Sequence, residues 1–379
     1  MLKLKQDREC LDVMVFLDRV GHGGVSRVAC IVAEGCARAG LRTKVVARDA
    51  GIARQGLLSD DVQLTLLADP GPSGRPGRVR IAQALAEQVR RDRPRVLLSP
   101  GNQTNPLVAL AHLLAGTGRQ TALVVKLTNP ISKQRRKKLK HWYRHQLHRW
   151  IFSRAAAILV LSPERGQLLA KQFSGSAAKL RFVHNPCVTS GMVPLPASAS
   201  GSEGTDVPEI LAIGRLTEQK NLLMLLRAAA SLRHLPWRIS ILGTGPDEQR
   251  LRDLAAELGI ADRTVFQGYV SDPIAYMQRA RLLALPSRWE DLPAVVLEAM
   301  ACGCPVVATA CADSLVSIIK EAAYGRLVPV GGEAAFAAAL AEMLTDPPPR
   351  RRPSMVDAYT IDNGITDHLQ AFRPWLTQA

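Results

Sequence analysis

Short apolar runs alternate with helical stretches along nearly the whole chain of 379 residues. This alternation is typical of an α/β fold in which helices cover both faces of a buried parallel sheet. In the first half, strands are expected at 12–17, 43–47, 62–67, 96–99, 122–127, 157–161 and 180–183. The helices expected between them cover 25–39, 79–91, 106–114, 132–154 and 164–173.

The pattern stops at residues 190–208, which are rich in Pro, Ser, Gly and Ala and show no periodicity, as expected of a linker. It then restarts, with strands expected at 209–214, 238–242, 264–267, 282–285 and 305–309. The helices expected here cover 222–235, 247–258, 273–279, 293–303, 314–320 and 333–344. The chain is too long for one ordinary core, so we expect two similar domains, 1–189 and 209–350. Ligands of such sheets bind beyond the carboxyl ends of the strands, so a cleft between the domains is the expected active site.

Composition restricts the class of protein. A hydrophobic content of 47% with ordinary Gly and Pro is typical of a soluble globular protein. No apolar run reaches eighteen residues, and the charged start of the chain lacks an apolar signal core, so a cytoplasmic protein is expected. Cys302, Cys304 and Cys311 lie close in sequence, but no His is near enough to complete a zinc site. Reduced structural thiols are therefore favoured over a metal.

Positive charge is concentrated in the first half. Residues 1–190 carry 32 Lys and Arg against 12 Asp and Glu, whereas the remainder carries 17 against 21. Much of the excess lies in the expected helix 132–154, whose cations are Lys133, Arg135, Arg136, Lys137, Lys138, Lys140, Arg144, Arg149 and Arg154. Because Trp142, Tyr143 and Trp150 accompany them, this helix suits an anionic membrane surface. A solvated helix face and a nucleic-acid site are the alternatives.

Glu290 and Glu298 are separated by seven residues and are the most informative pair in the chain. A strand-like run at 281–286 precedes them, Pro293 suits the first turn of a helix, and Gly303 suits its end. Glu290 therefore belongs to a loop and Glu298 to an otherwise apolar helix. A carboxylate there is costly unless it is hydrogen-bonded, and a ribose diol would supply two donors. A half-exposed Glu on a partly wetted face is the alternative.

Two cations follow the expected strand 209–214. Arg215 and Lys220 come at its carboxyl end, and Asn221 is placed to cap the next helix. Two cations beside a helix N-terminus form an anion site. The alternative is a pair of surface cations in a loop.

Glycines follow two other strands. Gly243 and Gly245 would permit close approach of a ligand, although a plain turn explains them as well. Gly21, Gly23 and Gly24 lack the full spacing of dinucleotide folds, and no acidic residue occupies the expected later position, which disfavours NAD. A phosphate or sugar at the helix N-terminus is favoured instead.

Polar residues also follow two strands of the first domain. Asn102 and Thr104 come after 96–99, and Lys126 and Asn129 come after 122–127. They could line an acceptor pocket, or they could serve only as caps and turns. No Asp-x-Asp, Walker-type phosphate loop or Gly-x-Ser-x-Gly elbow occurs. A bound diphosphate would therefore depend on the cations and helix termini described above.

In combination, these motifs resemble those of the retaining glycosyltransferases of family 4. The matching positions in the second half are Gly214-Arg215-Leu216, Lys220-Asn221, Gly243-Thr244-Gly245, Glu290, Glu298 and the run from Ala301 to Val307. In the first half they are Gly23 to Arg27, Leu161-Ser162 and Asn185-Pro186. The resemblance covers about residues 12–345. It implies the GT-B fold, in which two Rossmann-like domains face across a cleft, and a last segment, 351–379, that returns towards the first domain. Helical spacing of Ile365, Leu369, Phe372 and Leu376 agrees with a helix in that segment.

The resemblance further implies transfer of a sugar from a nucleotide sugar to an acceptor hydroxyl with retained configuration, without a metal, another cofactor or a protein nucleophile. Arg215 and Lys220 would bind the diphosphate and stabilise the leaving group. Glu290 would contact the sugar, and Glu298 would hold the ribose. The other donor-binding residues implied are Gly23, Gly24, Gly214, Gly243, Gly245, Gly268, Tyr269, Val270, Asp291, Leu292 and Pro293.

Two departures from the family pattern bear on substrates. Asp291 replaces the usual Gly, and the loops that carry Asn102 and Asn129 lack the histidine that many relatives place near the acceptor. The basic first domain suits a lipid-linked acceptor or another glycan, as in lipopolysaccharide or exopolysaccharide synthesis, on the inner face of a membrane and without nucleic acid. The alternatives are an inverting transferase or an epimerase, and a non-catalytic polyanion-binding protein that uses helix 132–154.

Overall fold

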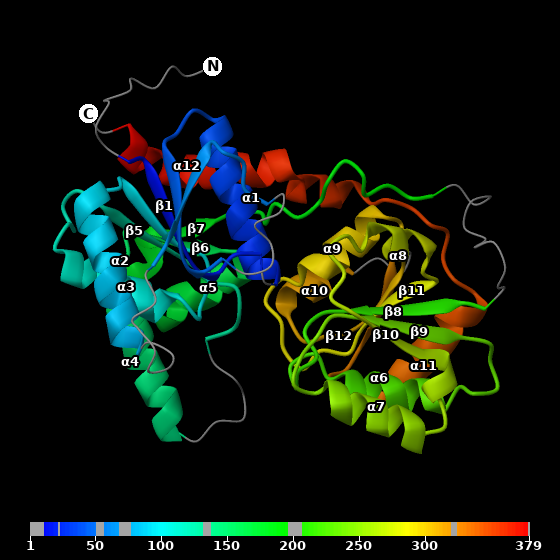
Figure 1. The fold of residues 1–379 in the computed structure, drawn as a ribbon. Helices are drawn as coiled ribbons and strands as arrows, with labels where there is room; N and C mark the ends of the chain where they lie inside the picture. Colours follow the sequence, from blue (N-terminus) through cyan, green and yellow to red (C-terminus); the bar gives the residue numbers. More distant parts are fainter. Residues whose placement is uncertain are drawn as a thin grey trace. The chain divides into compact units, whose positions relative to one another are not determined.

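The computed structural model describes residues 11–21, 23–50, 57–67, 77–131, 138–195, 207–319 and 324–377. The chain forms two compact units. One consists of Met1–Pro186 and Ile361–Ala379, and the other of Cys187–Thr360 (Figure 1).

A seven-stranded parallel sheet forms the centre of the first unit, in the order β3-β2-β1-β4-β5-β6-β7. Its strands are β1 (Val13–Arg19), β2 (Thr43–Asp49), β3 (Val62–Leu66), β4 (Val96–Ser99), β5 (Ala122–Lys126), β6 (Ala157–Val160) and β7 (Leu180–Phe182). The central strands β4, β5 and β6 are buried at every residue, whereas the edge strands β3 and β7 are partly exposed. Apolar runs without alternation are therefore the signature of the central strands.

Helices cover both faces of this sheet. They are α1 (Gly24–Arg38), α2 (Arg78–Asp92), α3 (Asn105–Ala115), α4 (Lys138–Arg154), α5 (Pro163–Gln172) and α12 (Ile361–Leu376). Helices α2, α3 and α4 share one apolar core with the strands, which includes Leu85, Val108 and Phe152. Helix α1 lies beside α12 (Figure 1).

The last helix completes the first unit. A Cβ atom added at Gly35 of α1 would lie 2.5 Å from the Ile365 side chain, and one at Gly364 would lie 2.7 Å from the backbone nitrogen of Pro186. Only glycine allows such close approach at both positions. Phe372 of α12 is fully buried, so this helix is part of the core rather than an appendage.

The second unit contains a six-stranded parallel sheet in the order β10-β9-β8-β11-β12-β13. Its strands are β8 (Glu209–Ile213), β9 (Arg238–Leu242), β10 (Thr264–Gly268), β11 (Leu282–Leu285), β12 (Val306–Thr309) and β13 (Gly325–Val328). Its helices are α6 (Leu222–Ala230), α7 (Glu248–Glu257), α8 (Ile274–Arg279), α9 (Ala294–Ala301), α10 (Asp313–Ile318) and α11 (Glu333–Thr345). Figure 1 shows α6, α7 and α11 on one face of the sheet and α8, α9 and α10 on the other. Trp237 and Phe336 are buried in the core on the α6 side.

The two ends of the second unit lie side by side. Residues 187–195 and 351–360 belong to it, although the sequence led us to expect a linker from 190 and a returning segment from 351. The backbone N–H groups of Cys187 and Val188 both donate to the Tyr359 carbonyl, and Met192 is buried. Apolar residues therefore hold the first part of the expected linker in place. Residues 196–206 of the expected linker lie outside the described residues.

The expected fold class is confirmed: both halves are parallel α/β units, and their topology is that of doubly wound sheets. Every strand expected from the sequence is present within one or two residues of its predicted bounds. One strand, β13, was not predicted. It is a short edge strand with partly exposed residues in its middle, so it lacks the continuous apolar run of the others.

Candidate active site

Three strand-to-helix turns lie against one another at the carboxyl edge of the second sheet. β8 pairs with β9 so that Ile213 is opposite Leu242, which places Gly214 beside Gly243. Gly214 N donates to Leu242 O at 2.9 Å, and Gly243 N donates to Gly268 O at 2.6 Å. A Cβ atom at Gly243 would lie 2.0 Å from the carbonyl oxygen of Gly214. The predicted glycines therefore allow the turns to approach one another, whether or not a ligand is present.

Gly245, two residues after Gly243 in the same turn, also allows a close approach between two turns. A Cβ atom there would lie 2.2 Å from Leu216 O, and the Leu216 N–H donates to Thr244 O at 3.0 Å. The Gly-Thr-Gly turn is thus bonded to the turn that carries Arg215 and Lys220. A fixed backbone at this edge positions both cations.

Lys220 and Glu290 meet at this edge. Lys220 Nζ donates to Glu290 Oε1 at 2.8 Å, and the Lys220 side chain passes over Gly214, where any Cβ would lie 2.8 Å from Lys220 Cε. Glu290 is buried, with 7% of its surface exposed. The two residues come from the turn after β8 and the turn after β11, which are neighbouring strands. The structure therefore brings together one predicted cation and one predicted acid.

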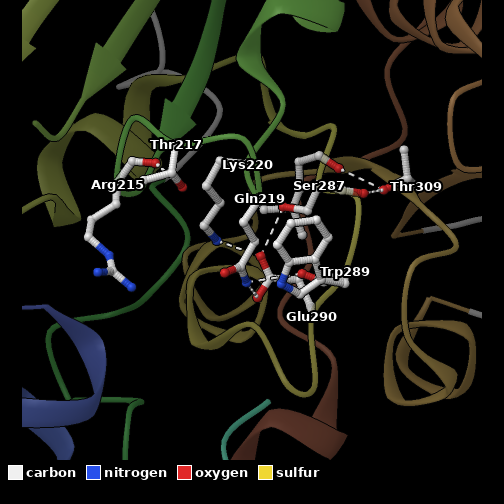
Figure 2. A network of polar contacts seen from close by, with 9 residues as sticks. Arg215, Thr217, Gln219, Lys220, Ser287, Trp289, Glu290 and Thr309 are labelled. Carbon is white, nitrogen blue, oxygen red and sulfur yellow. Dashed lines mark hydrogen bonds and ion pairs between the residues drawn. The ribbon is translucent and has the colours of Figure 1, made fainter. Parts of the chain in front are cut away.

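Polar side chains surround the Glu290 carboxylate (Figure 2). Oε1 also accepts a hydrogen bond from Ser287 Oγ at 2.9 Å, and Oε2 accepts one from Gln219 Nε2 at 3.3 Å. Ser287 is itself held by Thr309, whose hydroxyl donates to the Ser287 carbonyl. With Lys220, three side-chain donors are hydrogen-bonded to the two oxygens of Glu290.

Arg215 lies apart from this group. Its side chain is exposed and extends away from Glu290 (Figure 2). Within the described parts of the chain, no hydrogen bond or ion pair of its guanidinium group is found. Its five N–H donors are thus available for an anion.

Asn221 is the N-cap residue of α6, as predicted, but its side chain makes no capping hydrogen bond to the backbone of the helix. The residue has φ +51°, and its side-chain amide donates to the Pro286 carbonyl at 3.3 Å. The same amide lies 3.6 Å from Met224 Sδ in the first turn of α6. Asn221 ties the loop of Lys220 to the loop of Glu290.

Helix α9 carries the second acid. Glu298 is buried among apolar neighbours such as Leu297 and Ala299, as the sequence suggested. Leu292 and Asp291, which precede the helix, are buried too, and the Asp291 carbonyl accepts a hydrogen bond from Ser314 Oγ. Pro293 is the N-cap residue of α9 rather than a residue of its first turn.

The turn after β10 is more open. Gly268 has φ +67° with open space where a Cβ would project, and Tyr269 is largely exposed. Val270 is partly exposed. An exposed aromatic ring beside a glycine suits stacking against a flat ligand.

In the first unit, Gly23 is the N-cap of α1 with φ +82°, and Gly24 begins the helix. A Cβ at either position would meet nothing within 4 Å. Ser26 holds this turn: its Oγ accepts from Gly21 N and donates to Arg19 O, both at 2.8 Å. Of Gly23 and Gly24, only Gly23 has the left-handed backbone conformation that favours glycine.

Two loops at the carboxyl edge of the first sheet are joined by Asn102. Its amide donates to Asn129 O at 2.9 Å, and its Oδ1 accepts from the backbone N–H of Thr128 at 2.7 Å and of Asn129 at 3.2 Å. Thr104 is the N-cap residue of α3, but its hydroxyl bonds to Ser99 Oγ at 2.9 Å and makes no capping hydrogen bond. Asn102, Thr104 and Asn129 are partly exposed. Three of the four predicted acceptor residues thus lie near one another.

Lys126 differs from these three, because it is buried. Its Nζ donates to Asn185 Oδ1 at 2.7 Å and lies 3.0 Å from Nε2 of His368 on α12. His368 Nδ1 lies 2.6 Å from the Gly364 carbonyl, so Nδ1 carries the proton and Nε2 accepts from Lys126. Burial, followed by the charge of Lys126, lowers the pKa of His368 well below its usual value. Lys126 is therefore a core cation rather than a residue on an open acceptor surface.

Helix α4 begins at Lys138 in the structure, and Lys133, Arg135, Arg136 and Lys137 of the predicted basic helix lie outside the described residues. Its exposed face includes Trp142, with 60% of its surface exposed, and Tyr143, with 64%. Over the described parts of the chain, no helix is both long and apolar enough to cross a bilayer.

The cysteines near α9 are free thiols; Cys302 and Cys304 are buried, and Cys311 is partly exposed. Burial raises the pKa of Cys302 and Cys304 to about 12 and that of Cys311 to about 11. Such thiols are protonated at neutral pH and are poor nucleophiles. Among the residues with described positions, no three His, Cys, Asp or Glu side chains are grouped so as to hold a metal.

Several residues of these clusters were not predicted: Gln219, Ser287 and Thr309 around Glu290, and His368 near Lys126. Asn185 was noted as a family position, but its bond to Lys126 was not predicted. Gln219 is the neighbour of Lys220, and Ser287 precedes Glu290 by three residues, so adjacency to a predicted site residue was a usable signal. His368 had no such signal, since it lies 242 positions from Lys126.

Comparison with known proteins agrees with the motifs. The family described as "Glycosyl transferases group 1" matches residues 197–355, and the "Glycosyl transferase 4-like domain" matches residues 23–186. Together the two matches cover most of the chain.

The chain is also similar to named proteins in sequence and to solved structures in fold. An N-acetylgalactosamine-N,N'-diacetylbacillosaminyl-diphospho-undecaprenol 4-alpha-N-acetylgalactosaminyltransferase of Campylobacter jejuni is 26% identical over 65% of this chain and 66% of its own length. The lipopolysaccharide core biosynthesis glycosyltransferase LpsE of Rhizobium meliloti is 29% identical over 37% of this chain and 41% of its own length. The chain thus matches less than two thirds of the length of these curated relatives.

Anabaena HepE, solved with UDP and glucose, is structurally similar with a TM-score of 0.72 at 16% identity, over 97% of both chains. Matches in both halves, together with structural similarity over nearly the whole length, lead to one assignment. The chain belongs to the group 1 glycosyltransferases and has their GT-B fold.

Proposed function

We propose that the protein is a retaining glycosyltransferase that moves a sugar from a nucleotide-diphosphate sugar to a hydroxyl of a glycan or lipid-linked acceptor. The pairing of Lys220 with the buried Glu290 carries this proposal. A lysine and a buried carboxylate at the carboxyl ends of adjacent parallel strands suit a ligand that has both a phosphate and sugar hydroxyls.

Each part of the donor has a proposed partner. Lys220 and the unengaged guanidinium of Arg215 bind the diphosphate, with help from the N-terminus of α9. Glu290 accepts from a sugar hydroxyl, and Glu298 accepts from the ribose hydroxyls. Tyr269 lies at the base end.

Bond changes in the reaction are simple. The bond between the anomeric carbon and the diphosphate oxygen breaks, and the acceptor oxygen attacks the same face of the sugar. The acceptor proton passes to the departing phosphate. Arg215 and Lys220 stabilise the negative charge that develops there, which is the main contribution of the protein in this scheme.

The relatives indicate which nucleotide and which class of acceptor to test first. HepE binds UDP and glucose in its solved complex, so UDP is the first nucleotide to test. The names of the Campylobacter and Rhizobium relatives favour a lipid-linked acceptor of lipopolysaccharide or related polysaccharide synthesis.

A location at the inner face of a membrane is part of the same proposal. It rests on the basic helix α4 with its exposed Trp142 and Tyr143. Cosedimentation with phosphatidylglycerol vesicles should exceed that with phosphatidylcholine vesicles, and changing both aromatic residues to Ser should weaken it. Equal sedimentation with both vesicles would count against a membrane role.

Thermal unfolding in the presence of UDP, GDP, ADP and their sugars, with and without EDTA, tests the central assignment. A bound nucleotide at a hundredfold excess over its Kd should stabilise the fold by about 2.7 kcal/mol. EDTA should have no effect on this stabilisation. If no nucleotide or nucleotide sugar stabilises the protein, and binding to polyanions falls steeply with salt, the protein is a polyanion-binding protein instead.

A further inference from the structure

Gln219 joins the loop of Lys220 to the loop of Glu290 by three hydrogen bonds. Its Nε2 donates to Glu290 Oε2 at 3.3 Å and to Trp289 O at 3.0 Å, and its backbone carbonyl accepts from Arg288 N at 2.8 Å. About seventy positions of sequence separate the two loops. No other side chain in the described structure bonds to both the Glu290 carboxylate and the backbone of its loop.

Most hydrogen-bond acceptor positions of the Glu290 carboxylate are already occupied. An ionised carboxylate offers about four lone-pair positions, two on each oxygen. Lys220 and Ser287 occupy both positions on Oε1, and Gln219 occupies one on Oε2. Among the contacts of the described residues, one acceptor position on Oε2 is left.

We propose that Gln219 is a positioning residue that fixes the direction of this last lone pair, so that Glu290 accepts a hydrogen bond from a single hydroxyl of the donor sugar. The inference rests on the proposed function, since it concerns the sugar part of a nucleotide sugar. Gln219 acts through Glu290 and not on the nucleotide, because its amide faces the 288–290 loop.

A neutral amide suits this position. Both partners of Nε2, a carboxylate oxygen and a carbonyl oxygen, are acceptors, so the residue between them has to supply two N–H donors. Methionine has a similar length but no donor. Glutamate would place a second carboxylate against Glu290 and compete for Lys220. It becomes a donor only when it is protonated.

The experiment uses the full chain and the nucleotide and nucleotide sugar that bind best in the thermal panel. The variants are Gln219→Met and Gln219→Glu, with Gln249→Met as a matched control on the exposed face of α7, where Gln249 bonds only to Asp253 in the described contacts. We expect Gln219→Met to leave nucleotide affinity little changed, to remove the extra affinity that the sugar adds, and to lower kcat/KM by about 10- to 100-fold. The control variant should behave as the unchanged protein does.

Gln219→Glu gives a pH signature that a purely structural role would not produce. At neutral pH its two facing carboxylates should make it less active than Gln219→Met. As the pH falls, the introduced carboxyl group gains a proton and can donate to Glu290, so its activity relative to Gln219→Met should rise.

Two results would overturn the positioning role. One is equal loss of affinity for nucleotide and nucleotide sugar in Gln219→Met, and the other is a pH profile of Gln219→Glu that parallels that of Gln219→Met. If the unchanged protein binds no nucleotide sugar, the proposed function itself fails, which is a separate outcome.

Discussion

The Nζ atom of Lys220 lies 2.8 Å from Oε1 of Glu290, although seventy positions separate the two residues. We expect Lys220→Met to destabilise the fold by about 1–3 kcal/mol, less than a fully buried pair would lose, because 18% of the Lys220 side chain is exposed. Glu290→Gln should cost less, since it removes the buried charge. Urea unfolding of both variants and of the double variant would measure the coupling, and additive losses would show that the pair contributes nothing.

Lys220 should also be needed for the transfer reaction, for a reason separate from its effect on stability. Loss of the Lys220 charge should lower kcat by about 100- to 1000-fold, since that charge is proposed to stabilise the leaving diphosphate. Transfer measured on folded Lys220→Met protein checks this. Full activity would exclude Lys220 from the reaction.

Glu298→Gln should weaken nucleotide binding by about 10- to 100-fold, because hydrogen bonds to a charged group contribute roughly 1.5–3 kcal/mol. Glu298 is buried on α9, so titration calorimetry should be accompanied by an unfolding curve. Glu333→Gln, at an exposed position that begins α11, is the matched control. Equal affinity in Glu298→Gln and the control would remove Glu298 from the ribose site.

Gly243→Ala should destabilise the second unit by about 3 kcal/mol or more, since its Cβ would lie 2.0 Å from Gly214 O at φ +133°. Gly331→Ala is a matched control, because Gly331 also has positive φ but open space around its Cβ. There we expect about 1–2 kcal/mol from conformation alone. Urea midpoints of the two variants distinguish the contributions, and equal shifts would mean that the turns can separate.

His368 predicts a pH dependence of stability. Its pKa in the folded protein is well below the usual value, mainly because of burial. As the pH falls below about 6.5, the unfolded chain binds a proton that the folded protein does not, so stability should fall by about 1.4 kcal/mol per pH unit from this residue. Unfolding free energies between pH 8 and pH 5 should show a shallower slope in His368→Gln. An unchanged slope would mean that His368 does not stay neutral in the fold.

The sequence predicted elements whose signal is local. Central strands such as β4 and β11 are recognisable because burial on both faces demands continuous apolar runs. Edge strand β13 is only partly buried, so it needs no continuous apolar run, and it was not predicted. The start of α6 at Leu222 was predicted correctly, but the side-chain cap was not found, because the Asn221 amide bonds to the Pro286 carbonyl instead.

The sequence predicted individual residues of the site, but not which of them bond to one another. Lys220 and Glu290 could each be selected from local motifs, but the sequence carries no signal that Gln219 bonds to the loop of Glu290. Lys126 shows the same limit. Its place at the end of β5 suggested an open pocket, whereas a helix from the far end of the chain covers it.

The position of α12 also has a consequence for biosynthesis. The first unit needs Ile365, His368 and Phe372 to close its core, and the ribosome adds these residues only after the whole second unit has been made. Domains usually mature in the order in which they emerge. In this protein the first unit completes its core only after the second unit has been synthesised. A nascent chain stalled before Ile361 would therefore leave the surfaces beside Gly35 and Lys126 uncovered.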